Sequence, residues 1–178
     1  MATTTITVNS PTPITFEHIA TLPITQTTAV VSMFKNATSV NLNGATGILV
    51  DTTNNKAYYN TYAFAFANCT ALTTITLPEN LETIKSGTFY NCSSLVNLEI
   101  PYTVTSIEVR AFYKCSNLLY VTLGKKIEYI ASSAFQLCQK LEEIYYEGKV
   151  SDWKAIDGYR YITKVSIVCY DNTFYLSN

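Results

Sequence analysis

The sequence predicts a solenoid of stacked parallel β-strands with turn or 3₁₀ connections, preceded by a small β-rich N-terminal segment. Three observations lead to this fold class: a repeat of 23 residues, an alternation of apolar and polar residues inside each repeat, and a Pro or Gly where the alternation ends. A single unit of this length cannot bury its own apolar side chains. Stacking gives each unit a neighbour to pack against and predicts one continuous core.

Four copies of the repeat align without an insertion when the chain is compared with itself at a shift of 23 residues. Seven columns of the alignment are apolar, and the first two hold only Phe and only Cys. Because cysteines in one stacked core column pack as small apolar residues, we expect buried thiols and neither disulfides nor a metal site. The core residues predicted in these two columns are Phe66, Phe89, Phe112, Phe135, Cys69, Cys92, Cys115 and Cys138.

Each unit is expected to contribute one strand. In Leu95–Ile100, apolar and polar residues alternate, which is typical of a strand with one buried face. Pro101 or Gly124 follows such a stretch and ends it. The Ala111–Cys115 segment is too short for an independent helix, so we predict a turn or 3₁₀ piece that places its Phe and Cys in the core.

The repeats divide the chain into three parts. Residues 62–156 hold the four repeats, and residues 157–178 are expected to form a C-terminal cap. Within the cap, Lys164–Cys169 keeps the register of the fourth strand, which predicts a fifth strand in a decayed unit. An open edge of stacked strands favours aggregation, so bulky side chains should cover it. The candidates are Trp153, Tyr159, Tyr161, Tyr170, Phe174 and Tyr175.

Residues 1–61 differ in composition from the repeats. Glu17 and Lys35 are the only charged residues among the first 50, whereas Thr residues and short β-branched runs are frequent. Such an uncharged surface suits contact with another protein, so we interpret this part as an attachment segment that docks on a larger assembly. A plain N-terminal cap is the alternative. Within residues 1–61 we predict a hairpin at Val50–Tyr59 and a decayed repeat at Phe34–Val40.

Composition and motifs argue against several classes of function. With 12 basic and 13 acidic residues, the formal net charge of −1 does not supply the positive surface that nucleic acids or anionic membranes attract. No apolar stretch is long enough for membrane insertion, and the N-terminus lacks the pattern of a signal peptide. His18 lies far from every cysteine, and no phosphate loop or hydrolase motif occurs. We therefore expect no enzyme activity, no cofactor and no nucleic-acid partner.

The repeat resembles the BspA-type leucine-rich repeat, whose unit reads AFxxCxxLxxIxLPxxLxxIxxx. Ala65–Leu72 and Tyr90–Leu95 fit this pattern closely. The stretch Ile144–Gly148, followed by Trp153, looks like the module that often follows the last repeat in such proteins. The resemblance covers about residues 62–170 and implies a leucine-rich repeat solenoid with a non-catalytic role in surface recognition. Adhesion and binding to host tissue are the usual associations of the family in bacteria and protists.

The outward side chains of the predicted strands form the candidate binding face. In a stacked sheet these Tyr, Thr, Asn and Glu residues lie in adjacent rows. Aromatic rings stack on apolar ligand surfaces while short polar groups fix orientation, which suits a protein or a glycan. An ordinary solvated surface is the alternative, and Tyr90 and Tyr113 on the opposite turn are a second candidate. The residues of the face are Thr74, Thr76, Asn97, Glu99, Tyr120, Thr122, Glu143 and Tyr145.

The function that these features favour is non-enzymatic recognition and attachment. The low charge and the missing signal pattern suit a virion-associated component, such as a phage decoration or fibre-type protein. Residues 1–61 then dock on the particle and the repeats bind a surface protein or glycan. A bacterial surface adhesin of the same repeat type is the first alternative, and an intracellular scaffold for other proteins is the second. The corresponding locations are the virion or the cell surface.

Overall fold

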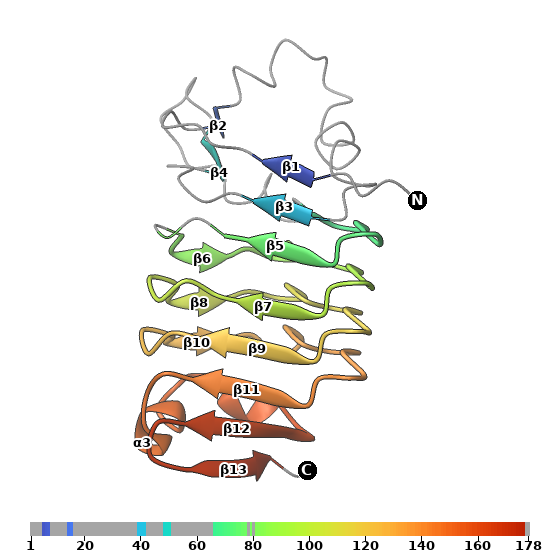
Figure 1. Cartoon of the computed structure of the whole chain (residues 1–178). Coiled ribbons are helices and arrows are strands. Elements are labelled where there is room, and N and C mark those ends of the chain that lie inside the picture. The colour runs from blue at the N-terminus through green and yellow to red at the C-terminus, as the bar shows by residue number, and fades with distance from the viewer. Residues whose placement is uncertain are drawn as a thin grey trace.

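Each turn of the solenoid contributes one strand to a stack along one side of the molecule, here called the strand side (Figure 1). The computed structural model describes residues 66–77, 79 and 81–176, and the backbone of four short strands before them. The prediction of a solenoid of stacked parallel strands is confirmed. The strands of the strand side are β1 (Thr5–Thr7), β3 (Ser39–Asn41), β5 (Thr74–Thr76), β7 (Asn97–Glu99), β9 (Tyr120–Leu123), β11 (Glu143–Tyr146), β12 (Val165–Cys169) and β13 (Thr173–Leu176).

Parallel pairing places equivalent residues of successive repeats side by side. Leu98 pairs with Val121, Val121 with Ile144, and Ile144 with Ile167. These side chains are at most 2% exposed, so the apolar faces of these four strands enter the core. β12 is the fifth strand expected from the register of Lys164–Cys169. β13 pairs antiparallel with β12 and falls outside the repeat pattern.

A second sheet, made of very short strands, forms another side of the solenoid. Its strands pair in parallel, again between residues one repeat apart. This sheet is absent from the sequence prediction, because two residues are too few to reveal an alternation. The isoleucine of each strand occupies the last predicted apolar column and is at most 1% exposed. The strands are β6 (Thr83–Ile84), β8 (Ser106–Ile107) and β10 (Tyr129–Ile130).

The Phe and Cys columns lie in the turns, which form the remaining side, here called the turn side. The four Phe rings stack nearly parallel, with successive centroids 5.4, 5.3 and 5.0 Å apart. The Cys92 thiol donates a hydrogen bond to the Phe66 carbonyl at 3.1 Å, and Cys115 and Cys138 repeat this contact at 3.1 and 3.0 Å. All five cysteines are free. The thiols therefore link successive turns in addition to filling the core.

Burial of the two columns is complete until the last repeat. Phe135 and Cys138 are only partly buried, and pack against the edge of the core. The remaining six predicted residues, at most 2% exposed, are Phe66, Phe89, Phe112, Cys69, Cys92 and Cys115. The contrast arises because every earlier turn has another turn stacked on it.

The residue before each repeat cysteine adopts a left-handed backbone conformation. The φ angles are 62° at Asn68, 57° at Asn91, 61° at Lys114 and 64° at Leu137. Asn adopts this conformation at a lower cost than Lys or Leu, which explains its occurrence in the first two turns. Asn91 Nδ2 also donates to Asn68 Oδ1 at 2.9 Å. The column thus combines a backbone requirement with a side-chain contact between turns.

The C-terminal cap is built differently from the prediction. Trp153, at the end of helix α3 (Val150–Trp153), is fully buried and contacts Tyr146 edge-on at 5.4 Å. Phe174 and Tyr159 pack partly against the core, the latter from the 3₁₀ helix η2 (Tyr159–Tyr161). Because β13 covers the strand edge with its own backbone, the other predicted aromatics are not needed there. The prediction that they supply bulk to the cap is wrong for Tyr161, Tyr170 and Tyr175, which are 60%, 84% and 58% exposed.

The N-terminal strands continue the strand side beyond the repeats. β1 pairs with β3 and β3 with β5, all in parallel, so that Val40 pairs with Ile75. β2 (Ile14–Thr15) and β4 (Ile48–Val50) form a separate parallel pair. The rest of residues 1–61 lies outside the described residues. This includes most of the predicted decayed repeat and the predicted hairpin beyond Val50, so the attachment role and the cap role of the segment both stay predictions.

A polar cluster joins two successive turns next to the second sheet. Lys85 Nζ lies 2.8 Å from Glu108 Oε1, and the backbone N–H and the hydroxyl of Ser86 donate to Glu108 Oε2. Partial burial opposes ionisation of Glu108, but the hydrogen bonds from Lys85 and Ser86 and the charge of Lys85 outweigh it. The pKa of Glu108 is consequently lowered.

Truncating a ring in the middle of the Phe stack should be strongly destabilising. We expect Phe112→Ala to lower the free energy of unfolding by about 3–5 kcal/mol, because it opens a cavity between two rings. Urea unfolding followed by circular dichroism measures the difference. Tyr170→Ala, at an 84% exposed position, is the control and should change stability by less than about 0.5 kcal/mol. A loss below about 1 kcal/mol for Phe112→Ala contradicts the core assignment.

Acid should weaken the contact at Glu108. Because its pKa is lower in the folded chain, the carboxylate stabilises the fold above the unfolded-state pKa of about 4.3, and this contribution is lost as pH falls through the folded-state value. The wild type should therefore lose more stability than Glu108→Gln between about pH 7 and about pH 3. Urea midpoints at the two pH values test this. Equal losses in both proteins would show that the carboxylate does not contribute.

Candidate functional site

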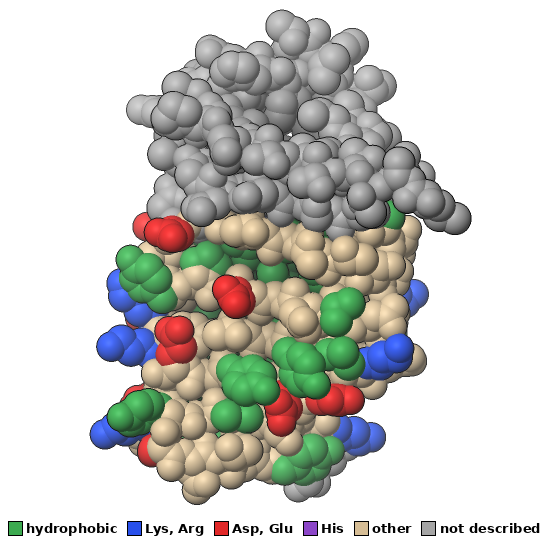
Figure 2. Space-filling model, in the orientation of Figure 1, with side chains coloured by type: hydrophobic (Ala, Val, Ile, Leu, Met, Phe, Trp, Pro, Cys, Tyr) green, Lys and Arg blue, Asp and Glu red, His purple; other side chains and the backbone are tan. Residues whose placement is uncertain are grey.

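The predicted binding residues lie on the outer surface of the strand side, in rows that cross the strands. All eight are exposed or half-exposed. Thr74 and Thr76 occupy the outward positions of β5. In the view of Figure 2, Lys and Arg side chains lie toward the edges, whereas Asp and Glu also lie across the middle of the face. One row of paired neighbours contains Asn97, Tyr120 and Glu143, and the next contains Glu99, Thr122 and Tyr145.

The strand side has a seam between β5 and β7. These two strands belong to different hydrogen-bonded sheets, although they contact each other. Just before β7, the Val96 N–H donates a backbone hydrogen bond to the Thr73 carbonyl of the preceding repeat, with an N–O distance of 3.4 Å. The equivalent bond one repeat later, Leu119 N–H to Val96 O, is 2.8 Å. The strands are therefore joined less tightly at the seam than beyond it.

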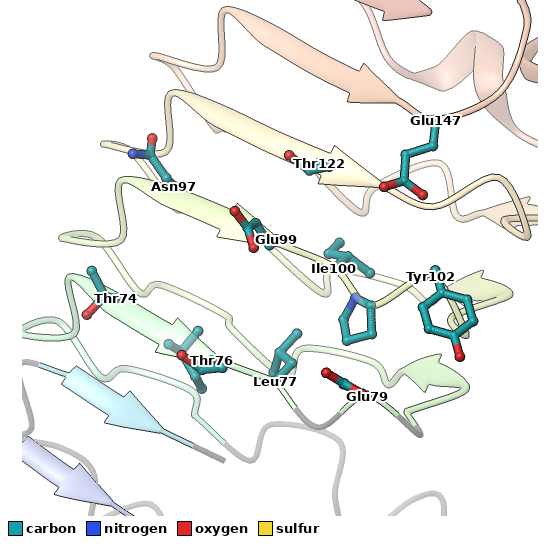
Figure 3. A pocket seen from close by; sticks show the side chains of 12 residues that line it. Thr74, Thr76, Leu77, Glu79, Asn97, Glu99, Ile100, Tyr102, Thr122 and Glu147 are labelled. Carbon is teal, nitrogen blue, oxygen red and sulfur yellow. The ribbon is translucent and has the colours of Figure 1, made fainter. Parts of the chain in front are cut away.

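A hollow of about 690 Å³ lies over this seam (Figure 3). Its floor contains core side chains: Ile75, Leu77 and Ile100 are 8%, 5% and 4% exposed. Five of the predicted binding residues line it, and we call it the seam hollow. The described residues that line it are Thr74, Ile75, Thr76, Leu77, Glu79, Asn97, Glu99, Ile100, Pro101, Tyr102, Thr122 and Glu147.

The charges of the seam hollow are all negative. Glu79, Glu99 and Glu147 contribute carboxylates from three different repeats, and none of the described lining residues is basic. Tyr102, 58% exposed, stands at its edge, with Lys126 Nζ 5.4 Å from the ring centroid. Such a site repels anions and attracts cations, and its aromatic edge and apolar floor can pack against aliphatic groups.

Gly124 allows the turn beside Tyr102 to approach closely. A Cβ atom at this position would lie 2.5 Å from the Tyr102 Cα atom, which is shorter than any normal contact. The glycine occupies the column in which the preceding repeat has Pro101. Its absence of a side chain is therefore part of what positions Tyr102.

The other three predicted residues form a separate cluster. The rings of Tyr120 and Tyr145 are 6.2 Å apart and tilted by 52°. The Tyr120 hydroxyl donates to Glu142 at 3.4 Å, and the Tyr145 hydroxyl donates to Glu143. The hydrogen bond to Glu143 raises the pKa of Tyr145. This cluster adds two aromatic rings to the same face but does not line the seam hollow.

Four lining residues with reactive or bulky side chains are missing from the sequence prediction. Glu79, Pro101, Tyr102 and Glu147 come after the strands, in the two columns that follow the last buried position of each strand. The predicted binding residues include only positions that face outward inside the strands. The available signal was the variation of these two columns, in which Glu147 stands where an earlier repeat has Pro101.

The cysteines and acidic groups offer no catalytic or metal-binding arrangement in the part of the chain that the structure describes. Burial raises the pKa of Cys69 to about 11, and burial is also the main cause of the raised pKa of Cys92. Thiols in this state are poor nucleophiles near neutral pH. Among the described residues, no cluster of three or more His, Cys, Asp or Glu could hold a metal ion. No helix in that part is long and apolar enough to cross a membrane.

The second candidate from the sequence lies on the turn side. Tyr90 and Tyr113 stack with centroids 5.1 Å apart. Arg110 and Lys114 place their cationic groups 5.7 and 5.8 Å from the Tyr113 centroid. This surface is basic and aromatic, in contrast to the acidic seam hollow.

Comparison with family models gives a match over residues 49–161. The matching model describes the BspA type leucine rich repeat region, and it occurs in six copies. The match covers more than half of the chain. It begins before residue 62, where the sequence analysis places the first full repeat.

Three solved structures are similar to this chain. A leucine rich cell surface protein from Faecalibacterium prausnitzii has a TM-score of 0.59 and 28% identity, over 68% of this chain and 29% of that one. A leucine rich repeat protein from T. pallidum gives 0.53 and 23%, over 75% and 58%. A leucine-rich repeat protein from Bacteroides ovatus gives 0.53 and 20%, over 74% and 36%. The chain thus spans less than two thirds of each, and no curated protein matches it.

Proposed function

We propose, from the premise that this chain belongs to the BspA-type leucine-rich repeat family, that it is a recognition protein. Its seam hollow binds a protein segment that carries Lys or Arg side chains. Members of the family typically act as non-enzymatic binding scaffolds, which supports a binding role over a catalytic one. The repeats then serve as a rigid frame for the side chains of the strand side.

The observation that carries this proposal is the composition of the seam hollow. Three carboxylates lie around an apolar floor, and no residue of the described lining is basic. A Lys or Arg side chain has an aliphatic stem and a cationic head, so it can contact the floor and the carboxylates together. Tyr102 offers an exposed ring for a second cation or for an apolar group.

A protein partner fits these charges better than a glycan. Neutral sugars can donate hydrogen bonds to these carboxylates but bring no positive charge to offset them, and glycans with sulfate or carboxylate groups are repelled by them. The hollow also follows the direction of the strand stack over β5, β7 and β9, which suits an extended segment. A glycan ligand is retained as an outcome of the binding experiment.

The proposed location is a bacterial cell surface. Proteins of this repeat type are typically found there, and the Faecalibacterium protein, 28% identical, is described as a cell surface protein. This favours the adhesin alternative over the virion-associated component. The virion hypothesis depends on docking through residues 1–61, most of which lie outside the described residues. It stays a prediction.

Removing two carboxylates from the seam hollow should weaken binding of a basic peptide. The probe is a decapeptide of alternating Lys and Ala, with affinity measured by titration calorimetry at low ionic strength. We expect the double variant Glu99→Gln/Glu147→Gln to bind about fivefold to thirtyfold more weakly, since an exposed ion pair contributes at most about 1 kcal/mol. Added salt should weaken wild-type binding.

The matched control removes two exposed carboxylates next to the second sheet, just before β6 and β10. Glu82→Gln/Glu128→Gln makes the same change in net charge outside the hollow and should alter the affinity by less than about twofold. An equal loss in both double variants contradicts a specific site. Binding of neutral glycans, without binding of the peptide, would replace the protein partner by a carbohydrate.

Fractionation of the native source distinguishes the two locations. We expect the untagged protein to remain with the cell envelope fraction and to be accessible to an antibody on intact cells. Co-sedimentation with a virus-sized particle at a fixed stoichiometry would instead support the virion hypothesis and make residues 1–61 the segment to study next.

A further inference from the structure

The turns of the solenoid are joined by a regular pair of backbone hydrogen bonds. The N–H of each repeat Phe donates to the carbonyl just before the Phe of the next turn, as in Phe89 to Ala111 at 2.7 Å. The residue two positions later donates to the carbonyl just after that Phe, as in Asn91 to Tyr113 at 2.7 Å. The same pair links the first turn to the second and the third to the fourth. Every turn thus offers two donors to the turn that follows.

In the fourth turn these two donors are left over. Within the described part of the chain, the N–H groups of Phe135 and Leu137 have no hydrogen-bond acceptor. The residues at the equivalent acceptor positions are Asp157 and Tyr159, and their carbonyls accept other bonds, from Ile130 at 2.8 Å and from Ile162 at 3.3 Å. The cap therefore leads the chain away from the place that a fifth turn would take.

A second hollow, of about 550 Å³, occupies that place, and we call it the end hollow. The fourth turn lines one side of it and residues 161–165 line the other. Phe135, the last ring of the stack and only partly buried, lines it, and its rim includes Leu137 and Tyr161, 45% and 60% exposed. Lys164 is the only charged residue among the described residues of this lining.

We propose that the end hollow binds a segment of a partner protein that presents an aromatic side chain next to an acidic residue. The aromatic ring continues the stack on Phe135, where successive rings of the chain itself lie 5.0–5.4 Å apart. The two carbonyls that flank it accept the N–H groups of Phe135 and Leu137. The acidic neighbour pairs with Lys164.

The partner segment does not come from the second, third or fourth repeat turn of another copy of this chain. A docking turn needs free carbonyls on both sides of its Phe. At Phe89, Phe112 and Phe135, both flanking carbonyls already accept N–H groups from the preceding turn. These turns have no acceptor to offer unless the solenoid opens. A foreign segment does not have this limitation.

The end hollow differs in chemistry from the seam hollow, so this site is independent of the proposed function. Donors and one cation line the end hollow, whereas carboxylates line the seam hollow. The two sites select different partners. One chain could therefore bind a basic segment on its strand side and an acidic, aromatic segment at its end.

The test uses the full chain and a capped pentapeptide with the sequence Ala-Glu-Phe-Glu-Ala. In ¹⁵N-resolved NMR spectra, titration should shift the amide signals of Phe135 and Leu137, and fluorescence anisotropy of a labelled peptide gives the affinity. Leu137→Asn should reduce the affinity at least fivefold. Asn suits the left-handed backbone at this position, as at Asn68 and Asn91, so the fold should be retained.

Val109→Asn is the matched control, because Val109 is a 49% exposed apolar residue in an earlier turn, and it should leave binding unchanged. A peptide with Ala in place of Phe should not bind. Equal affinities of wild type and Leu137→Asn, or no shift at the two amides, would overturn the proposal. Self-association that depends on concentration in sedimentation experiments and is abolished by Leu137→Asn would also overturn it, in favour of a second copy.

Discussion

The stacking of equivalent residues at a fixed interval is the constraint on which the rest of the structure depends. Parallel pairing sets each side chain beside its counterpart in the next turn. The side chains at equivalent positions of successive repeats must therefore be able to pack against each other. Two aromatic rings can stack and two side-chain amides can form a hydrogen bond, as in the Phe stack and the Asn68–Asn91 contact. Charged residues do not, because like charges at this spacing repel. The column that contains Lys85 accordingly continues with Glu108.

The same constraint explains how the strand side can gather negative charge. The three carboxylates of the seam hollow come from three different columns, and in each column the described neighbours of the Glu are uncharged or basic. Glu99 has Thr76 before it and Thr122 after it, and Glu147 follows Gly124. No carboxylate is stacked on another, yet all three line the same hollow. The hollow thus gathers three negative charges although no two Glu side chains are stacked directly on each other in one column.

The sequence was informative where the constraint acts and uninformative where it is relaxed. The Phe and Cys columns, the strands that contain Leu98 or Val121 and the fifth strand follow from periodicity, because burial at one position is repeated at the next. The β6, β8 and β10 strands are too short to show an alternation, although their isoleucines recur every 23 residues. The left-handed conformation at Lys114 and Leu137 is not indicated by their residue types. The seam hollow depends on a missing pairing between β5 and β7, although their apolar columns match perfectly well. Column variation marks the positions of Tyr102 and Glu147, but it does not show that a hollow forms beside them.

The cap protects one edge of the solenoid and leaves another open, and the difference follows from what each edge exposes. A five-residue strand such as β12 presents a continuous row of backbone groups, which is a template for aggregation, and β13 covers it. On the turn side, among the described residues, the two N–H groups that join one turn to the next have no acceptor at Phe135 and Leu137. Two donors beside a half-buried ring are too few to nucleate a new strand, but they define where an aromatic residue and its two carbonyls can bind. An unfinished turn can thus remain open for recognition at little risk to the folded state.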